Sequence, residues 1–249
     1  MNKNSNFDSI NNIDSKDFLN NTSVDMQKTI ELETKSKNNL LTDKIENAMA
    51  IQDYMVFFST QTESYCVGYV DMVSSTKISA YLGIGKACRY YQIFLNSISG
   101  ILTKYGGTVI KNVGDSLLYY FPESKNGIKK FGLLSCIEGS LAILEAHDKI
   151  CNVLQKEGLP DVNYRISADY GAVVLVKQNN TENADLMGPP VNLCSKINRM
   201  AGKNGFVIGG DLYHMVKTLT DYTFKGIEGY SSGLKYSYPV FSVRRKIIY

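Results

Sequence analysis

The sequence predicts an α+β fold built on a ferredoxin-like βαββαβ core, with further helices and strands added at the C-terminal end. Three observations support this prediction: short β-branched and aromatic runs, longer stretches with apolar residues at helical spacing, and glycine-containing turns between them. The chain has 249 residues, of which 44% are hydrophobic and 20% charged. These values fit one sizeable domain with extensions.

The N-terminal quarter is expected to be the least structured part. Residues 1–40 hold Asn clusters and mixed charges with few aromatics, which predicts a disordered tail. Residues 41–62 are expected to form a helical lead-in, because Leu41, Ile45 and Ala48 recur at helical spacing. This helix has two possible roles, packing on its own domain or forming a dimer seam. The compact domain is then expected over residues 63–249.

The first half of the predicted core starts with a buried strand over Tyr65–Asp71. The next segment is predicted to be a helix ended by Gly106-Gly107, because its apolar residues form one continuous stripe: Tyr91, Phe94, Leu95, Ile98, Ile101, Leu102 and Tyr105. Two β-rich runs follow, Thr108–Lys111 and Ser116–Phe121. Between them, residues 112–115 are predicted to form the tip of a hairpin.

The second half begins with a predicted long helix over residues 127–156, with Leu134 on its apolar face. A strand is expected over residues 162–168, followed by a turn at Tyr170-Gly171 and another strand over residues 172–176. Beyond the core, the pattern predicts a helix near residues 191–200, a strand at residues 206–208 and terminal strands after Tyr222.

Charge and cysteine usage limit the partners and the compartment. The net charge is +3 and the Lys and Arg residues are scattered, so no nucleic-acid partner is expected. The five cysteines stand singly in apolar stretches, which predicts reduced core residues in a cytoplasmic protein. No apolar run approaches the ~20 residues that span a bilayer, so no membrane association is expected.

Asp71 ends the first predicted strand and is followed by a small, hydroxyl-rich turn that includes Ser74, Ser75 and Thr76. Backbone N–H groups at such a helix start can bind phosphates, and the carboxylate can hold the metal ions that accompany them. The three hydroxyl residues are therefore candidate substrate-binding residues. An ordinary strand-to-helix cap has the same sequence pattern.

Asp115 at the predicted hairpin tip is the natural partner of Asp71. In a ferredoxin-like sheet the first and third strands are neighbours, so the two carboxylates can meet. Two divalent metal ions ~3.5–4 Å apart would neutralise both carboxylates and support phosphoryl chemistry. A turn residue bonded to its own backbone is the alternative for Asp115.

Four segments, in this order, resemble the catalytic domain of class III adenylate/guanylate cyclases. They are YVDMVSST, GGTVIKNVGDSLLYYF, YRISADYGAVV and DLMGPPVNLCSKINRMA. The resemblance covers about the last three quarters of the chain, and it implies the class III nucleotidyl cyclase fold. It also implies that Asp71, Asp115 and the backbone carbonyl of Met72 hold two Mg²⁺ or Mn²⁺ ions per site.

The resemblance also assigns Lys111 and Asp185 to recognition of the base. Family members that use ATP carry Lys and Asp at these positions, whereas those that use GTP carry Glu and Cys or another small residue. Adenine offers an acceptor at N1 and a donor at its 6-amino group, which Lys and Asp complement. Guanine has the reverse pattern, so the pair favours ATP.

Three further residues carry roles implied by the resemblance. Asn192 matches the asparagine that orients the ribose, and Lys225 matches a lysine that contacts phosphate. Lys196 stands where the family has an arginine that stabilises the transition state, and Lys lacks the planar fork of Arg. Its role could instead pass to the neighbouring Arg199.

The resemblance implies an enzyme that forms 3',5'-cyclic AMP and pyrophosphate from ATP. In the family, the aspartates of one subunit work with the base-reading and transition-state residues of the other, so a homodimer is implied. Two alternatives remain at this point. One is a cyclase for another nucleoside triphosphate, and the other is a catalytically silent nucleotide-binding regulatory module.

Overall fold

The computed structural model describes residues 28, 31–44, 56–122, 131–178, 184–230 and 237–246. The chain divides into two compact units, Met1–Tyr54 and Met55–Tyr249, which we describe separately.

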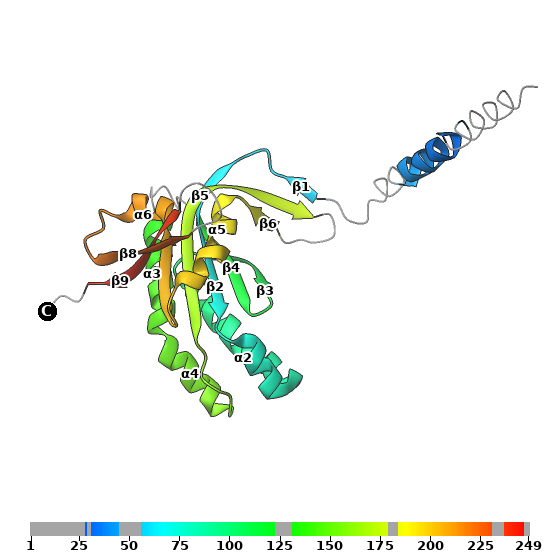
Figure 1. Cartoon of the computed structure of the whole chain (residues 1–249). Coiled ribbons are helices and arrows are strands. Elements are labelled where there is room, and N and C mark those ends of the chain that lie inside the picture. Colours follow the sequence, from blue (N-terminus) through cyan, green and yellow to red (C-terminus); the bar gives the residue numbers. More distant parts are fainter. Residues whose placement is uncertain are drawn as a thin grey trace, which may run out of the picture. The chain divides into compact units, whose positions relative to one another are not determined.

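In the first unit, residues 31–44 form a helix (Figure 1). Glu31 and Glu33 each precede a lysine by four residues, the favourable order for side-chain pairing along a helix. The helix therefore begins earlier than the lead-in that the sequence predicts from residue 41. The predicted apolar positions Ile45 and Ala48 lie outside the described residues.

The second unit is organised around a nine-stranded sheet with the strand order β3-β4-β2-β5-β7-β9-β8, while β1 and β6 also pair with β5. All neighbouring strands run antiparallel except β5 and β7. The strands are β1 (Val56–Phe58), β2 (Glu63–Met72), β3 (Thr108–Val113), β4 (Ser116–Pro122), β5 (Tyr164–Gln178), β6 (Ala184–Met187), β7 (Gly205–Gly209), β8 (Tyr222–Tyr230) and β9 (Tyr238–Arg245).

Helices cover both faces of this sheet (Figure 1). They are α2 (Ser75–Lys104), α3 (Phe131–Glu145), α4 (His147–Lys156), α5 (Pro189–Ile197) with the 3-10 turn η1 (Asn198–Met200), and α6 (Gly210–Val216). The largest apolar cluster joins α2, α3, α4 and α6 to one face of the sheet. On the other face, α5 and β6 pack over the middle strands through Cys194 and Leu186.

The predicted ferredoxin-like core is confirmed. Its elements follow the order β2-α2-β3-β4-α3/α4-β5, and its strands lie in the order β3-β4-β2-β5. Helix α2 ends as expected, because the N–H groups of Gly106 and Gly107 bond to the carbonyls of Thr103 and Leu102. The hairpin tip also forms as expected, with Gly114 at φ 64°.

Three local predictions are wrong. The helix expected over residues 127–156 breaks at Ala146, where His147 Nε2 lies 2.9 Å from the carbonyl oxygen of Val162; residues 127–130 lie outside the described residues. Leu134 is 46% exposed, because the buried face of α3 follows its neighbours Leu133 and Ile137. The third is the turn at residues 170–171, where β5 continues because its ladder with β2 runs unbroken through both positions.

The lead-in to the core also differs from the helix that the sequence predicts over residues 41–62. Val56–Phe58 form the strand β1, which pairs with residues 176–178 of β5. A β-branched residue followed by two aromatics favours a strand at a sheet edge over a helix.

Most of the cysteines occupy the predicted core positions. All five cysteines are free; four are buried and Cys88 is exposed, so only Cys88 departs from the predicted core position. Within the described residues, no helix is both long and apolar enough to cross a membrane.

Candidate functional site

The candidate site lies on the sheet face covered by α5. Side chains alternate along a strand, so Tyr69 and Asp71 of β2 share the face of Val67, which packs against α5. Asp71 lies opposite Ser116 of β4 and opposite Arg165 of β5. The carboxyl end of β2 therefore carries an acidic group between a hydroxyl and a guanidinium.

Asp71 and Asp115 interact electrostatically, as the sequence predicts. Ser116 Oγ donates a hydrogen bond of 2.6 Å to Asp71 Oδ1. The pKa of the Asp71 carboxyl is raised by burial and by the charge of Asp115, against the lowering effects of Ser116, Arg165 and Arg199. A carboxylate that feels the charge of a second one nearby is suited to binding cations.

The available donors fit a hard divalent cation that takes some of its ligands from the protein and the others from a bound substrate. Within the described residues, no three His, Cys, Asp or Glu side chains gather into a metal site. The two aspartates offer carboxylate oxygens, and Met72, a residue that is only 2% exposed, offers its backbone carbonyl. Mg²⁺ in particular binds through one or two carboxylates together with substrate phosphates. Asp71, Asp115 and Met72 therefore suit such an ion when substrate phosphates supply its other ligands.

The turn after Asp71 has a left-handed residue at its centre. Ser74 has φ 61° and ψ 26°, and its carbonyl accepts hydrogen bonds from Lys77 and Ile78. Helix α2 begins at Ser75, so the N–H groups of Ser75 and Thr76 belong to the first turn, which has no partners within the helix. These N–H groups can bind an anion next to Asp71.

Lys111 reaches this face of the sheet because of a β-bulge. The register between β3 and β4 shifts between Val109 and Lys111, so that Lys111 lies opposite Leu118. Leu118 belongs to the cluster under α5, and the bulge thus turns Lys111 toward the same face. There the Lys111 ammonium forms a salt bridge with Asp185 of β6. The structure therefore brings together two residues that the sequence assigns to base recognition.

Asp185 is also fixed by its own backbone. Its second carboxylate oxygen, Oδ1, accepts a hydrogen bond of 2.8 Å from the N–H of Leu186. The side chains of Lys111 and Asp185 remain 45% and 28% exposed, so a planar ligand can approach both groups. An ion pair this exposed contributes little to stability, which leaves room for a role in recognition.

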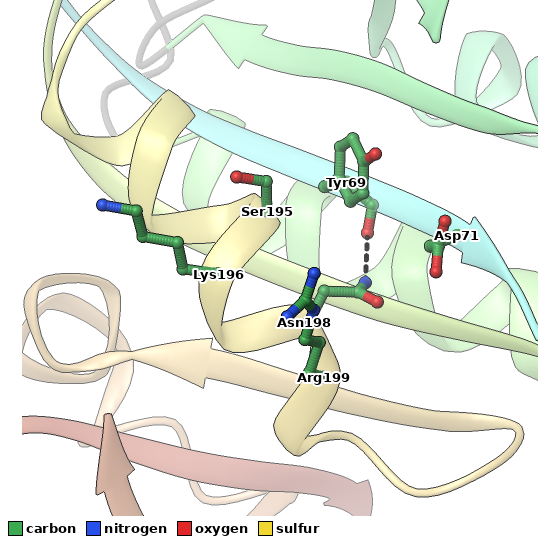
Figure 2. A pocket seen from close by; sticks show the side chains of 6 residues that line it. All are labelled: Tyr69, Asp71, Ser195, Lys196, Asn198 and Arg199. Atoms are coloured by element: carbon green, nitrogen blue, oxygen red, sulfur yellow. Dashed lines mark hydrogen bonds between the residues drawn. The ribbon is translucent and has the colours of Figure 1, made fainter. Parts of the chain in front are cut away.

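A pocket of about 350 Å³ lies between β2 and the segment formed by α5 and η1. Its lining combines Tyr69 and Asp71 of β2 with Ser195, Lys196, Asn198 and Arg199 (Figure 2). Lys196 was predicted as a catalytic residue, and the structure places it at this pocket. Its ammonium points away from Asp71 in Figure 2.

Arg165 is a candidate that the sequence analysis missed. Among the described residues, the Nε atom of this half-buried side chain is buried and has no hydrogen-bond partner, and a buried N–H without a partner is costly. It lies opposite Asp71 in the β2–β5 ladder and its charge acts on that carboxyl. The YRISADYGAVV segment contains Arg165, but only the strand pairing reveals that it faces Asp71.

Of the predicted site residues, only Asp71 and Lys196 line this pocket. Asn192 is exposed in α5, where its carbonyl accepts a hydrogen bond of 3.0 Å from Ser195 Oγ. Lys225 is exposed on β8, which ends the sheet path opposite to β3. The described chain therefore holds the aspartates and the base-reading pair in separate places and leaves Asn192 and Lys225 outside the pocket.

Solved structures with similar folds are adenylyl and guanylyl cyclases. The adenylyl cyclase CyaB from P. aeruginosa has a TM-score of 0.68 at 19% identity, covering 76% of this chain and 97% of that one. The guanylyl cyclase Cya2 has a TM-score of 0.65 at 16% identity, covering 74% and 92%. The guanylate cyclase domain of RhGC from Catenaria anguillulae, in complex with GTP, has a TM-score of 0.65 at 16% identity, covering 76% and 100%.

No family model and no curated protein matches the sequence. The similarity to the solved structures is therefore one of fold, and the chain has the class III nucleotidyl cyclase fold.

Proposed function

We propose that this chain, which has the class III cyclase fold, is a nucleotidyl cyclase that converts ATP into 3',5'-cyclic AMP and pyrophosphate as a homodimer. The observation that supports it most is the salt bridge between Lys111 and Asp185, formed by a bulge that turns Lys111 toward β6. A nucleoside triphosphate with its cations also accounts for Asp71, which feels the charge of Asp115, and for Arg165 opposite it, whose buried Nε has no hydrogen-bond partner among the described residues.

Lys111 and Asp185 would read the adenine edge. On binding, the Lys111 ammonium donates to adenine N1, and the Asp185 carboxylate accepts from the 6-amino group. The base replaces the exposed ion pair between the two side chains, and each charged group gains a hydrogen bond to the base in exchange. Guanine presents a donor at N1 and an acceptor at C6, which would oppose both side chains.

The triphosphate would bind at the carboxyl end of β2. Asp71, Asp115 and the Met72 carbonyl would hold two Mg²⁺ or Mn²⁺ ions, which activate the ribose 3'-oxygen and neutralise the phosphates. The other phosphate contacts would come from five residues of the α2 turn, β5 and β8: Ser74, Ser75, Thr76, Arg165 and Lys225.

A second copy of the chain would complete each site. Asn192 and Lys196 are exposed on α5, and Lys196 points away from Asp71 of its own chain. In a homodimer, Asn192 of one protomer orients the ribose while Lys196 stabilises charge on the α-phosphate of that nucleotide. The two aspartates come from the other protomer, so a monomer would be inactive.

The test is to incubate the purified protein with ATP, GTP, CTP or UTP, each with Mg²⁺ or Mn²⁺, and to identify products by mass spectrometry. We expect cyclic AMP, and none from the Asp71→Ala, Asp115→Ala double variant. A different cyclic nucleotide would contradict only the base assignment. No cyclic product with any substrate, from a dimer that binds nucleotide, would support a silent regulatory module instead.

Base recognition has its own test. The Lys111→Glu, Asp185→Cys double variant carries the residues expected in members that use GTP. We expect the ratio of kcat/KM for ATP over GTP to fall by at least about 100-fold, because both hydrogen-bonding groups reverse. An unchanged ratio would mean that other residues read the base.

A further inference from the structure

The segment α5–η1 carries two cations that face in different directions. Lys196 and Arg199 both line the pocket beside Asp71 and both are exposed. In Figure 2 the Lys196 side chain extends away from Asp71, whereas Arg199 turns back alongside Asn198. Two neighbouring cations on one short segment are thus placed for two different tasks.

Asn198 fixes the position of Arg199 relative to Asp71. Asn198 is 2% exposed, and its Nδ2 donates toward the carbonyl oxygens of Tyr69, at 3.3 Å, and Arg165, at 3.1 Å. These acceptors lie two residues before Asp71 on β2 and directly opposite it on β5. The residue that follows Asn198 is therefore attached to the same two strands that carry Asp71 and Arg165.

Arg199 and Asp71 of the same chain line one pocket. Arg165 lies directly opposite Asp71 in the β2–β5 ladder. Within the described residues neither guanidinium forms a salt bridge. Two guanidiniums that form no salt bridge in this part of the chain and lie beside the Asp71 carboxylate are suited to a phosphate chain that arrives with its own cations.

We propose that Arg199 contacts the triphosphate in cis, in the half-site built around Asp71 of its own chain. The inference rests on the proposed function and extends it, because Lys196 then serves the nucleotide held by Asp71 of the partner subunit. The planar fork of Arg199 forms two parallel hydrogen bonds to phosphate oxygens, which the ammonium of Lys196 cannot form. Each active site therefore receives one cation of this segment from each protomer.

Mixed dimers distinguish action in cis from action in trans. Two differently tagged variants are co-expressed, and the heterodimer is isolated by purification on both tags. In the Asp71→Ala with Lys196→Ala heterodimer, one site holds both defects and the other is intact, so we expect about half of wild-type activity. In the Asp71→Ala with Arg199→Ala heterodimer, each site holds one defect, so we expect at least about 10-fold less.

Homodimers provide the reference values. We expect Arg199→Ala to lower kcat/KM by about 10–100-fold, which is the usual size of a lost charge-assisted hydrogen bond, and Arg199→Lys to recover part of it. Asn192→Ala gives a second variant that acts in trans. Lys203→Ala, an exposed cation in the same region, should leave kcat/KM unchanged.

The inference is overturned by either of two results. The first is that the heterodimer of Asp71→Ala with Arg199→Ala is as active as the heterodimer of Asp71→Ala with Lys196→Ala. That result would mean that Arg199 acts in trans. The second is that the Arg199→Ala homodimer has wild-type kcat/KM. An inactive wild type would instead contradict the proposed function, and a binding measurement then decides the role of Arg199.

That measurement is the affinity of the dimer for inorganic tripolyphosphate with Mg²⁺, by calorimetry. We expect Arg199→Ala to weaken binding at least about 10-fold and Lys203→Ala to leave it unchanged. Equal affinities of wild type and Arg199→Ala, or no binding by the wild type, would overturn the contact.

Discussion

Ser74 holds a backbone conformation that glycine adopts more easily. Its φ of 61° lies in the left-handed region, and its side chain forms no capping hydrogen bond. Non-glycine residues there store strain of order 1 kcal/mol or more. The turn that carries the proposed phosphate contacts is therefore strained in the native chain.

We expect Ser74→Gly to raise the free energy of unfolding by about 0.5–1 kcal/mol, because the relief of strain exceeds the entropy cost of glycine. Urea unfolding followed by circular dichroism measures this change. The matched control is Ala80→Gly, at an exposed position inside α2, which should lower the free energy of unfolding by about 1 kcal/mol. If both variants are destabilised, the strain at Ser74 is absent.

Asp169 is a buried carboxyl that links stability to pH. It is 0% exposed, and it accepts hydrogen bonds from the N–H groups of Tyr170 and Leu212 and from the Tyr238 hydroxyl. Burial nevertheless raises its pKa to about 6, from 3.8, against the lowering effect of these three donors. Ionising this group therefore costs more in the folded chain than in the unfolded one.

The sign follows from linkage. A folded-state pKa above the unfolded value contributes stability that is full below pH 4 and is lost as pH rises through about 6. Asp169→Asn removes this titration and keeps an acceptor for both N–H groups. We expect wild type to lose up to about 3 kcal/mol relative to the variant between pH 4 and pH 7.5. Parallel unfolding curves across this range would contradict the assignment.

At the scale of elements, an ion-pair network joins α3 to the edge of the sheet. Arg245 at the end of β9 donates to both carboxylate oxygens of Glu138, at 2.7 and 2.8 Å, and to Glu145 at 2.7 Å. The hydroxyl of Tyr222 on β8 donates to the same Glu138. The network therefore ties β8 and β9 to the helix layer.

We expect Arg245→Met to lower the free energy of unfolding by about 1 kcal/mol, because the bidentate pair is only partly screened by water. The loss should shrink in 1 M NaCl, where charges are screened over about 3 Å. The neighbouring Arg244→Met is the control, since Arg244 is exposed and is expected to shift the value by less than about 0.5 kcal/mol. Equal losses in both variants would exclude the network as the cause.

The sequence predicted the order of elements but not how they join. Gly106 and Gly114 marked the end of α2 and the tip of the hairpin, because both adopt left-handed φ values that few other residues accept. No such mark exists for the bulge between Val109 and Lys111, which depends on contacts of β3 with β4 and β6. The unbroken course of β5 past Gly171 likewise depends on its pairing with β2.

At the scale of the whole molecule, the contact clusters divide the chain after Tyr54. We expect removal of residues 1–54 to change the Tm of the remaining unit by less than about 2 °C, because its packing is internal. Removal of residues 1–62 also deletes β1, which pairs with residues 176–178, and should lower the Tm by about 2–4 °C.

Differential scanning calorimetry of the two truncated chains measures this difference. Equal Tm values would support the domain boundary at residue 63 that the sequence predicts. A large loss already at residue 54 would mean that the two units are coupled.

The candidate site was predictable only as separate pieces. Asp71 and Asp115 are suggested by local sequence, and Lys111 and Asp185 by the resemblance to cyclases. The structure joins Lys111 and Asp185 in a salt bridge, and the charge of Asp115 acts on Asp71. The sequence analysis did not identify Arg165, because its importance depends on the strand register that places it opposite Asp71. A buried side-chain nitrogen without a partner, such as Arg165 Nε, can be found only once its surroundings are known.

The hydrogen bonds of Asn198 also determine when the site can form. Its amide bonds to Tyr69, a residue 129 positions earlier in the chain. During synthesis, β2 therefore emerges long before the segment that completes the pocket beside it. Contacts between residues so far apart form slowly, since the loop between them must close first. A newly made chain must therefore remain without the pocket beside Asp71 until most of its length has left the ribosome, and only then could the proposed nucleotide assist its folding.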